Sequence, residues 1–441
     1  MESTEKNALC HILKIGEEEV SSYPSSLTPI SGGTLQMVSI RGEKQLLFKG
    51  GADAESGFHG RVLDGLGLLC PADHENRLVL NRILPFTKPV AFGRDIPTFG
   101  TGDRLGLASP GHILAFTGCR ARPVLAQQSK RELTLTGRNF RQVLDDVCFS
   151  VFREGYRRGF GADGDHLKTK EDIREALDEG YTMITLDCSE QMGSGMSGIV
   201  NYAEDVYYEL ILAQGRPIDF ELSIDETGTV TTAADHLYVA SELLKRKVHI
   251  TSLAPRFVGE FQKGIDYIGD ISEFHEHVKL HAEIAKSFGY KLSIHSGSDK
   301  FSVFPLIGRT TGGMLHVKTS GTNWLEAVRI IALMNPGLYR RMHNKALECF
   351  NDARKHYLVS AELKDVIPID RLSDSELPVL LEEDATRQLM HITYGHILGD
   401  KNLKTEIFNC LELNERAYKE GLAEHIGNHL RSLGLKEGAN G

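Results

Sequence analysis

Hydrophobic and polar residues follow two different periods between residues 96 and 335. Short runs alternate every second residue, as in a strand, and longer runs repeat their apolar residues every three or four positions, as in a helix. The first period predicts strands at 96–107, 123–127, 159–167, 182–187, 220–225, 248–253, 291–295 and 314–318. The second predicts helices at 139–158, 170–179, 201–214, 232–247, 271–288 and 323–334. Eight strands alternating with helical segments predict an α/β fold, a TIM-like (β/α)8 barrel, over an open sheet.

The two flanks of this region differ from it in pattern. Residues 1–95 contain strand-like runs at 36–41 and 45–48, which predicts a β-rich N-terminal addition. Residues 336–441 have a mostly helical pattern, which predicts a helical C-terminal extension. The sequence therefore predicts three parts, 1–95, 96–335 and 336–441, with the catalytic barrel in the middle.

Alternation within the predicted strands indicates what faces the barrel interior. In the seventh strand, Leu292 and Ile294 oppose Ser293 and His295. The apolar pair should therefore meet the outer helices, and the polar pair should face inward. Because buried polar groups are costly unless they are paired or bind a ligand, this pattern favours a working cavity over a purely structural barrel.

Composition narrows the class of protein. Of 441 residues, 41% are hydrophobic and 25% charged, as in an ordinary globular protein, and the net charge of -10 argues against a nucleic-acid partner. The N-terminus lacks the apolar core of a signal peptide, and no apolar run approaches the roughly 20 residues that span a bilayer. Seven dispersed cysteines without a C-x-x-C pair favour reduced thiols. We expect a cytoplasmic protein with no membrane partner.

Candidate catalytic and metal-binding residues stand where predicted strands end. Asp165 and His166 follow the third strand, where Asp165 suits a general acid or base and His166 a metal ligand; the alternative is a helix cap beside a surface histidine. His295, after the seventh strand, is the candidate second ligand, because imidazole nitrogen suits several divalent metals. Its alternative is an interior histidine with satisfied hydrogen bonds.

Two further segments add candidates on the other side of the barrel mouth. Asp225 and Glu226 end the fifth strand, where they suit an acid–base group facing Asp165, or else form a solvated turn. In the loop after the sixth strand, the carbonyl of Gln262 suits a metal shell, and Arg256 suits a carboxylate. The alternative for this loop is a polar surface segment.

The remaining candidates are substrate contacts at other strand ends. They are Asp103, Asp187, Ser296, Lys300 and Lys318. Asp163 is expected to orient its neighbours Asp165 and His166. Phe99-Gly100-Thr101-Gly102 matches neither G-x-G-x-x-G nor a P-loop, so the sequence predicts neither NAD nor ATP binding.

Five segments together resemble the tagaturonate/fructuronate epimerase family, which includes tagatose 4-epimerase-like relatives. They are GADGDHLK (161–168), SIDET (223–227), SLAPRF (252–257), SIHSGSDKF (293–301) and HVKTSGT (316–322). The resemblance runs from about Asp103 to Gly399 and implies a divalent-metal isomerase that interconverts two hexuronate ketoses at C4. By position it implies Asp165 as proton acceptor, Glu226 as proton donor, and His166, His295 and Gln262 as metal ligands.

The chemistry of C4 narrows the mechanism that this resemblance implies. The C4 proton of a 2-ketose is not acidic, so the favoured route is retro-aldol cleavage of C3–C4, with rotation of the aldehyde before rebonding. Transfer of protons through an enediol is the second route. A Lewis-acid metal would assist either one, and Zn, Mn, Ni, Co and Fe all remain open.

Other activities and partners stay open beside the favoured one. The small-molecule partner is a sugar acid or a neutral ketohexose such as tagatose or fructose. A metal-dependent aldolase or sugar isomerase, and a catalytically silent sugar-binding protein, are compatible with the same barrel. A homo-oligomer is equally open.

Overall fold

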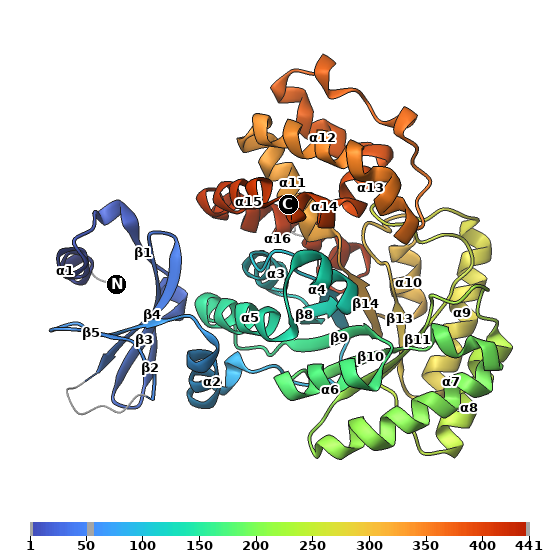
Figure 1. Ribbon diagram of the computed structural model, residues 1–441. Helices are drawn as coiled ribbons and strands as arrows, with labels where there is room; N and C mark the ends of the chain where they lie inside the picture. Colours follow the sequence, from blue (N-terminus) through green and yellow to red (C-terminus); the bar gives the residue numbers. More distant parts are fainter. Residues whose placement is uncertain (1–2, 51–56, 438–441) are drawn as a thin grey trace. The chain divides into compact units, whose positions relative to one another are not determined.

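The computed structural model describes residues 3–50 and 57–437, which fall into two compact units. The first comprises Met1–Pro89 and Arg141–Gly159, and the second comprises Val90–Phe140 and Phe160–Gly441. Figure 1 shows the antiparallel sheet of the first unit in blue and the parallel strands of the second in colours that run from teal through green to gold. Residues 336–437 belong to the same unit as the barrel.

The first unit is built on a six-stranded antiparallel sheet, so the prediction of a β-rich N-terminal part is confirmed. The sheet order is β1-β3-β4-β6-β5, with β2 paired to β3. The bounds are β1 Val20–Ser22, β2 Thr28–Ile30, β3 Gly33–Ile40, β4 Glu43–Gly50, β5 Arg61–Leu63 and β6 Gly67–Pro71. Helices α1 (Ser3–Leu13), α2 (His74–Ile83) and α5 (Phe140–Glu154) complete it, and Phe149 and Phe152 of α5 join Leu35 and Phe48 in one buried cluster.

The second unit contains a closed barrel of eight parallel strands, which confirms the predicted fold class. Neighbours in the chain are neighbours in the barrel, and β14 pairs with β7 to close it, with His316 opposite Thr98. The bounds are β7 Thr98–Thr101, β8 Arg122–Ser129, β9 Gly161–Leu167, β10 Met183–Asp187, β11 Asp219–Ile224, β12 Ser252–Pro255, β13 Lys291–Ile294 and β14 Leu315–Thr319. Their carboxyl ends therefore meet at one mouth.

The sixth strand lies further along the chain than its pattern predicted. The apolar run from Val248 to Leu253 predicted a strand there, but β12 begins at Ser252, opposite Glu221 of β11. Val248 and Ile250 are buried, so their pattern reflects packing of the segment that leads into the strand. An apolar run of this length is buried in either case, so its pattern does not distinguish a strand from a packed segment that precedes one.

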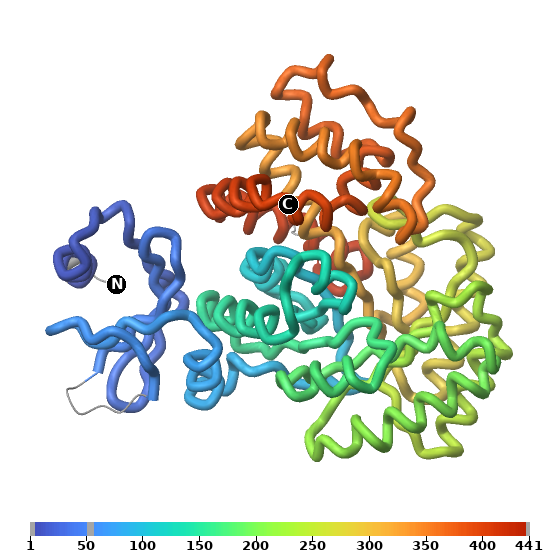
Figure 2. Tube along the Cα trace, viewed as in Figure 1, coloured from blue at the N-terminus to red at the C-terminus, as the bar shows by residue number. Residues whose placement is uncertain are grey.

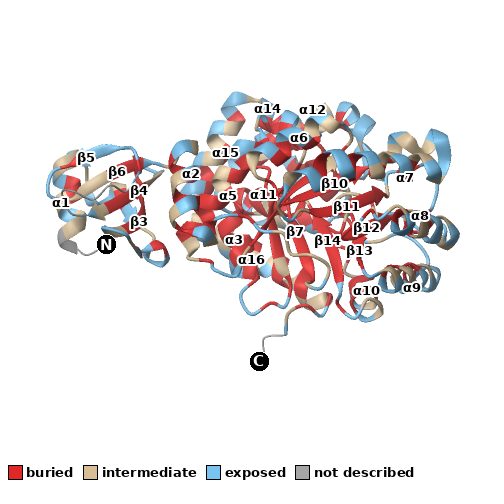
Figure 3. Cartoon of the chain, turned by 90° about the horizontal axis from the view of Figure 1, so that it is seen from below, coloured by how far each residue is buried: buried red, intermediate tan, exposed pale blue. Residues whose placement is uncertain are grey.

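Buried side chains fill both faces of the barrel wall, as the red strands β10 to β14 of Figure 3 show. Phe220, Leu222 and Ile224 of β11 alternate with the buried polar residues Glu221 and Ser223. Glu221 accepts a hydrogen bond from Ser252 and lies 2.7 Å from His295 Nε2, and the Ser223 hydroxyl donates to Asp225. These two groups therefore avoid the cost of about 1–3 kcal/mol that an unpaired buried polar group carries. The polar set of the strand pattern therefore occupies the inside of the barrel, as predicted.

Helices cover the outside of the barrel and are interleaved with its strands in the chain. Their bounds are α3 Ser109–Ala115, α4 Lys130–Thr136, α6 Lys170–Glu179, α7 Gly195–Val206, α8 Ala233–Lys245, α9 Ile271–Phe288, α10 Phe304–Thr310 and α11 Thr322–Met334. Side-chain caps fix where several begin: the Thr169 hydroxyl accepts from the Asp172 N–H at the start of α6, and Asp270 caps α9. The predicted helix 271–288 matches α9 at both ends.

The C-terminal segment is helical, as predicted, and packs on the barrel helix α11. Its helices are α12 Pro336–Ala353, α13 Asp384–Ile392, α14 Tyr394–Gly399, α15 Lys401–Leu413 and α16 Glu415–Ser432. Trp324 of α11 is fully buried, and its indole N–H donates to the Met390 carbonyl at 2.7 Å. Figure 2 traces this segment, in orange and red, alongside the barrel. Among the helices at 3–50 and 57–437, none has the length and apolar character needed to cross a membrane.

Candidate active site

Strand β9 carries an irregularity that brings two adjacent side chains into one cavity. Gly164 pairs with Ile184 of β10, but Leu167 pairs with Leu186, so β9 has one residue more than its partner between these points. His166 has φ 50°, in the left-handed region that non-glycine residues rarely adopt. Adjacent residues of a regular strand point to opposite faces, whereas Asp165 and His166 both line the cavity here. The bulge therefore allows both side chains to line the cavity.

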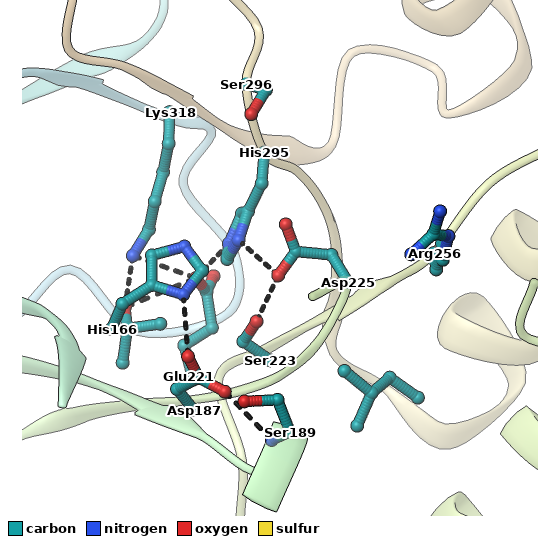
Figure 4. A network of polar contacts seen from close by, with 12 residues as sticks. His166, Asp187, Ser189, Glu221, Ser223, Asp225, Arg256, His295, Ser296 and Lys318 are labelled. Carbon is teal, nitrogen blue, oxygen red and sulfur yellow. Dashed lines mark hydrogen bonds and ion pairs between the residues drawn. The ribbon is translucent and has the colours of Figure 1, made fainter. Parts of the chain in front are cut away.

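His166 and His295 lie side by side, with ring centroids 4.8 Å apart. Figure 4 shows the two rings between Lys318 on one side and Asp225 on the other. His295 Nδ1 lies 3.0 Å from Asp225 Oδ1, and its Nε2 lies 2.7 Å from Glu221 Oε1. One ligand atom from each of His166, Asp225 and His295 lies within 4.8 Å of the others. The structure thus brings together two expected ligands and adds Asp225 to them.

Lys318 is buried among carboxylates on the inner face of the barrel. Its ammonium lies 2.6 Å from Asp163 Oδ2, 2.7 Å from Asp165 Oδ1 and 3.1 Å from Glu221 Oε1. Burial raises the pKa of Asp163 to about 6, against the effect of Lys318. Burial also opposes ionisation of Asp165, but Lys318 and the two histidines hold its pKa at about 2. Asp165 is therefore an ionised carboxylate with a hydrogen-bonded ammonium beside it.

Negative charge exceeds positive charge in this cluster. Asp163, Asp165, Asp187, Glu221 and Asp225 are its carboxylates, and Lys318 and Lys168 are the lysines in ionic contact with them. Burial would lower the pKa of His166, yet the neighbouring Asp165 and Asp225 raise it to about 10. Asp225 and Glu221 likewise raise the pKa of His295 against the effect of burial. A divalent cation held by imidazole and carboxylate would compensate the same charge, so the residues present fit a metal.

Asp187 supports His166 from strand β10. Its Oδ2 lies 3.5 Å from His166 Nδ1, and its Oδ1 accepts the Ser189 N–H at 2.8 Å. Only 1% of its side chain is exposed. Asp187 is therefore placed to orient the His166 imidazole, and it also lines the cavity in which a substrate contact was expected.

Glu226 lies at the exposed rim of the cavity. A carboxylate oxygen of Glu226 lies within 4.8 Å of ligand atoms of His166 and Asp187. Because Glu226 is exposed, its carboxylate is in contact with solvent. The structure therefore brings both expected acid–base residues to the same cavity.

Gln262 lies in the cavity wall, but its carbonyl oxygen is engaged away from the histidines. Gln262 Oε1 accepts the Ser360 N–H at 2.8 Å and the Gln388 amide at 2.8 Å. Its own amide donates to Glu260 Oε2 at 2.5 Å. Because both lone pairs of this oxygen are used, Gln262 ties its loop to the C-terminal segment. Its role as a metal ligand stays a prediction, and Asp225 is the carboxylate that lies beside the two histidines.

Two residues expected to contact substrate hold the backbone instead. Asp103 Oδ1 accepts the Leu105 and Gly106 N–H groups at 3.0 and 2.8 Å, so its carboxylate shapes the loop after β7. The Lys300 ammonium donates to three backbone carbonyls, those of Gln262, Ile265 and Ser298. Neither side chain lines the cavity.

Arg256 is the third expected contact that the structure places elsewhere. Its guanidinium donates to the Thr227 carbonyl and lines a smaller adjoining cavity of about 260 Å³. Figure 4 shows it lying away from the two histidines. Ser296, by contrast, lines the main cavity, has φ 50° and accepts a hydrogen bond from Lys263 at 2.8 Å.

The main cavity has a volume of about 430 Å³, a size typical of small-molecule sites. Sequence reasoning missed several of its side chains, namely Arg104, Gln127, Ser129, Arg131, Glu132, Lys263, Tyr357 and His391. Gln127 and Ser129 close strand β8, so the rule that strand ends carry function would have found them. Tyr357 and His391 come from the C-terminal segment and carried no sequence signal.

A parallel barrel that gathers ionisable groups at the carboxyl ends of its strands is typical of TIM-barrel enzymes, and this protein has that architecture and that site. The family profile described as "UxaE: tagaturonate epimerase" matches residues 23–199 and 195–433, and the chain belongs to this family. It is accordingly an epimerase, an enzyme of the isomerase class. The resemblance seen in the five sequence segments is confirmed.

Individual epimerases are also similar to this chain in sequence and in structure. The chain is 40% identical to the tagaturonate/fructuronate epimerase of Thermotoga maritima over 445 residues, which cover 89% of this chain and 92% of that protein. A glycerol complex of the fructuronate-tagaturonate epimerase UxaE from Cohnella laeviribosi superposes with a TM-score of 0.92 at 46% identity, covering 98% of this chain and 100% of that one. The native structure of the same enzyme gives a TM-score of 0.91.

Proposed function

We propose that this protein interconverts tagaturonate and fructuronate at C4 with a divalent cation held by His166, His295 and Asp225. The observation that supports the cation is the clustering of these three donor groups within 4.8 Å amid surplus carboxylates. The relatives' names support the substrate pair. When bound, such a cation would supply Lewis acidity toward the substrate's C2 carbonyl.

Asp165 is the proposed base of a retro-aldol step. It takes the proton of the C4 hydroxyl, and the electron pair left on O4 forms the C4–O4 double bond of an aldehyde. The C3–C4 bond breaks, and its electron pair remains on the C1–C3 fragment as an enediolate. Its pKa of about 2 keeps Asp165 ionised, and the Lys318 ammonium at 2.7 Å stabilises the carboxylate and donates a hydrogen bond where charge changes. Rotation of the C4–C6 aldehyde, rebonding to its other face and return of the proton complete the epimerisation.

Glu226 is the proposed second acid–base group. Its position at the exposed rim lets it exchange protons with water, while Asp165 is buried. In the retro-aldol route C4 keeps its hydrogen, and the proton that moves is the one on O4. Since O4 lies on opposite faces of C4 in the two epimers, a pair of carboxylates in such different surroundings suits this reaction.

The experiment that tests this function follows four sugars by NMR: tagaturonate, fructuronate, tagatose and fructose. We expect the two uronates to interconvert, activity to disappear after exhaustive chelation, and added divalent metal to restore it. Full activity in metal-free protein would refute the metal site, and stable accumulation of three-carbon products would indicate an aldolase.

Two further readouts test the roles within the site. Asp165→Asn should lower kcat at least a hundredfold, the usual range for an acid–base group, while metal content stays near that of the wild type. In deuterated water, the C4 position should stay free of deuterium on the retro-aldol route. Deuterium at C4 would favour the enediol route instead.

A further inference from the structure

Two cationic side chains in the main cavity differ from all the others that line it. Arg104, Lys130, Lys168 and Lys318 each have a carboxylate partner within 4 Å, namely Glu132, Glu175, Asp187 and Asp163. Arg131 and Lys263 line the same cavity and form no ion pair with any residue of 3–50 or 57–437. Carboxylates such as Glu226 and Glu132 attract both cations, but from beyond ion-pair distance. Two cations that no carboxylate contacts directly suit an anionic ligand group in the same cavity.

The two cations also lie close to each other. Arg131 comes from helix α4, and Lys263 from the loop after β12. Burial lowers the pKa of the Lys263 ammonium, and the charge of Arg131 lowers it further. Lys263 is half-buried and Arg131 is exposed, and both line the same cavity. Their like charges repel each other, and an anion between them would relieve that repulsion.

Neighbouring groups fix both side chains toward the cavity. The Lys263 ammonium donates to the Ser296 hydroxyl at 2.8 Å, next to the proposed metal ligand His295. The Arg131 guanidinium lies over the Tyr357 ring, 4.9 Å from its centroid. Arg131 and Lys263 also line the adjoining cavity that contains Arg256, so the positive region continues there.

We propose that Arg131 and Lys263 form the subsite that binds the carboxylate of the hexuronate and so determine the preference for uronates over neutral ketohexoses. This inference rests on the proposed function and names the part of the substrate that the two cations hold. The carboxylate is C6 of the sugar, and it stays on the C4–C6 aldehyde when C3–C4 breaks. Anchoring it therefore retains that fragment while the aldehyde turns to present its other face.

The test compares binding of galactonate, a six-carbon sugar acid that has no ketone to react, with binding of galactitol, the uncharged polyol of the same stereochemistry. Isothermal titration calorimetry of the metal-loaded enzyme should give tighter binding of galactonate in the wild type. Arg131→Met and Lys263→Met should each weaken galactonate about tenfold to a hundredfold, the usual range for a hydrogen bond to a charged group, and leave galactitol within about twofold. Arg131→Lys should keep most of the galactonate affinity.

A matched control is Lys245→Met, which removes an ammonium that is 69% exposed on helix α8 and should change neither affinity. Equal weakening of both ligands in the Arg131 and Lys263 variants, or equal binding of both ligands by the wild type, would overturn the inference. An assay of uronate conversion distinguishes failure of the anion subsite from failure of the proposed epimerase activity. A wild type that binds galactonate through the two cations but converts neither uronate would refute the epimerase proposal and leave the anion subsite standing.

Discussion

Replacing Lys318 by Met should destabilise the barrel strongly, because Met fills a similar volume without the charge. The Lys318 side chain is 4% exposed, and its ammonium contacts Asp163, Asp165 and Glu221 within 3.1 Å. Removing one partner of a buried ionic cluster typically costs about 3–5 kcal/mol, since the remaining charges stay buried without compensation. We expect Lys318→Met to lose stability in this range at pH 8.

The expected shift in melting temperature follows from the size of the barrel unit. Unfolding entropy is about 2.1 cal/mol/K per residue, so a cooperative unit of roughly 330 residues has an entropy of about 0.7 kcal/mol/K. A loss of about 3–5 kcal/mol therefore lowers Tm by about 4–7 °C.

The stability lost in Lys318→Met should also depend on pH, because Asp163 is a titrating group in contact with Lys318. Burial raises its folded pKa to about 6, above the ordinary value of 3.8, so in the wild type this group removes stability as pH rises between these two values. Without Lys318 the folded pKa of Asp163 should rise further, because the nearby positive charge that lowers it is gone. At pH 5 Asp163 is already mostly protonated in the wild type and in the variant, so a further rise of its pKa adds little cost there. At pH 8 the wild-type carboxylate is ionised beside Lys318, so the cost of the substitution should be larger at pH 8 than at pH 5.

Scanning calorimetry at pH 5 and pH 8 with fixed metal content measures both effects. Lys245→Met, at an exposed position, should stay within about 0.5 kcal/mol of the wild type. Lys318→Met combined with Asp163→Asn should recover part of the loss at pH 8. A Lys318→Met protein that melts within about 1 °C of the wild type, or whose loss is the same at both pH values, would refute the reasoning.

Two other substitutions test how the site is supported. Asp187→Asn should weaken metal binding about tenfold to a hundredfold, because Asp187 orients His166, and competition with a chelator measures this; unchanged affinity would contradict that role. Asp299→Asn should destabilise the protein by about 3–5 kcal/mol, because Asp299 lies 2.8 Å from Arg387 and 2.7 Å from His425, and Asn tolerates its backbone φ of 60°. Since the pKa of His425 is raised in the fold, its contribution is present at pH 6 and is lost as pH rises through that pKa. Chemical denaturation should therefore show a smaller cost of Asp299→Asn at pH 9 than at pH 6, and an equal cost would contradict the pairing.

Local sequence patterns predicted most of the barrel because helix caps and the spacing of apolar side chains depend on residues that are close together in the chain. The predicted helix 271–288 has a capping Asp270 and a left-handed Gly289, and its bounds agree with α9. Helix α7 begins at Gly195, six residues before the predicted start at 201. Gly195 and Gly198 lower helix propensity there, so packing and not local preference decides where this helix starts.

The candidate site, too, was predictable from the sequence only in part. Strand-end positions identified Asp165, His166 and His295 correctly as neighbours, since all carboxyl ends of a parallel barrel meet. The bulge that turns His166 into the cavity depends on how β9 pairs with β10, which no single segment encodes. Gln262 lines the cavity, but the groups that hold its side-chain oxygen come from the C-terminal segment. Lys300, expected as a substrate contact, lies outside the cavity lining and donates to loop carbonyls. Side-chain type alone cannot distinguish a residue that binds substrate from one that holds a loop.

The most direct test of the account is an NMR time course of the metal-loaded protein with pure tagaturonate, repeated with pure fructuronate. The account predicts that each sugar forms the other and that both reactions reach the same final mixture. Conversion of neither uronate, or a mixture in which only C3–C4 cleavage products accumulate, would contradict it.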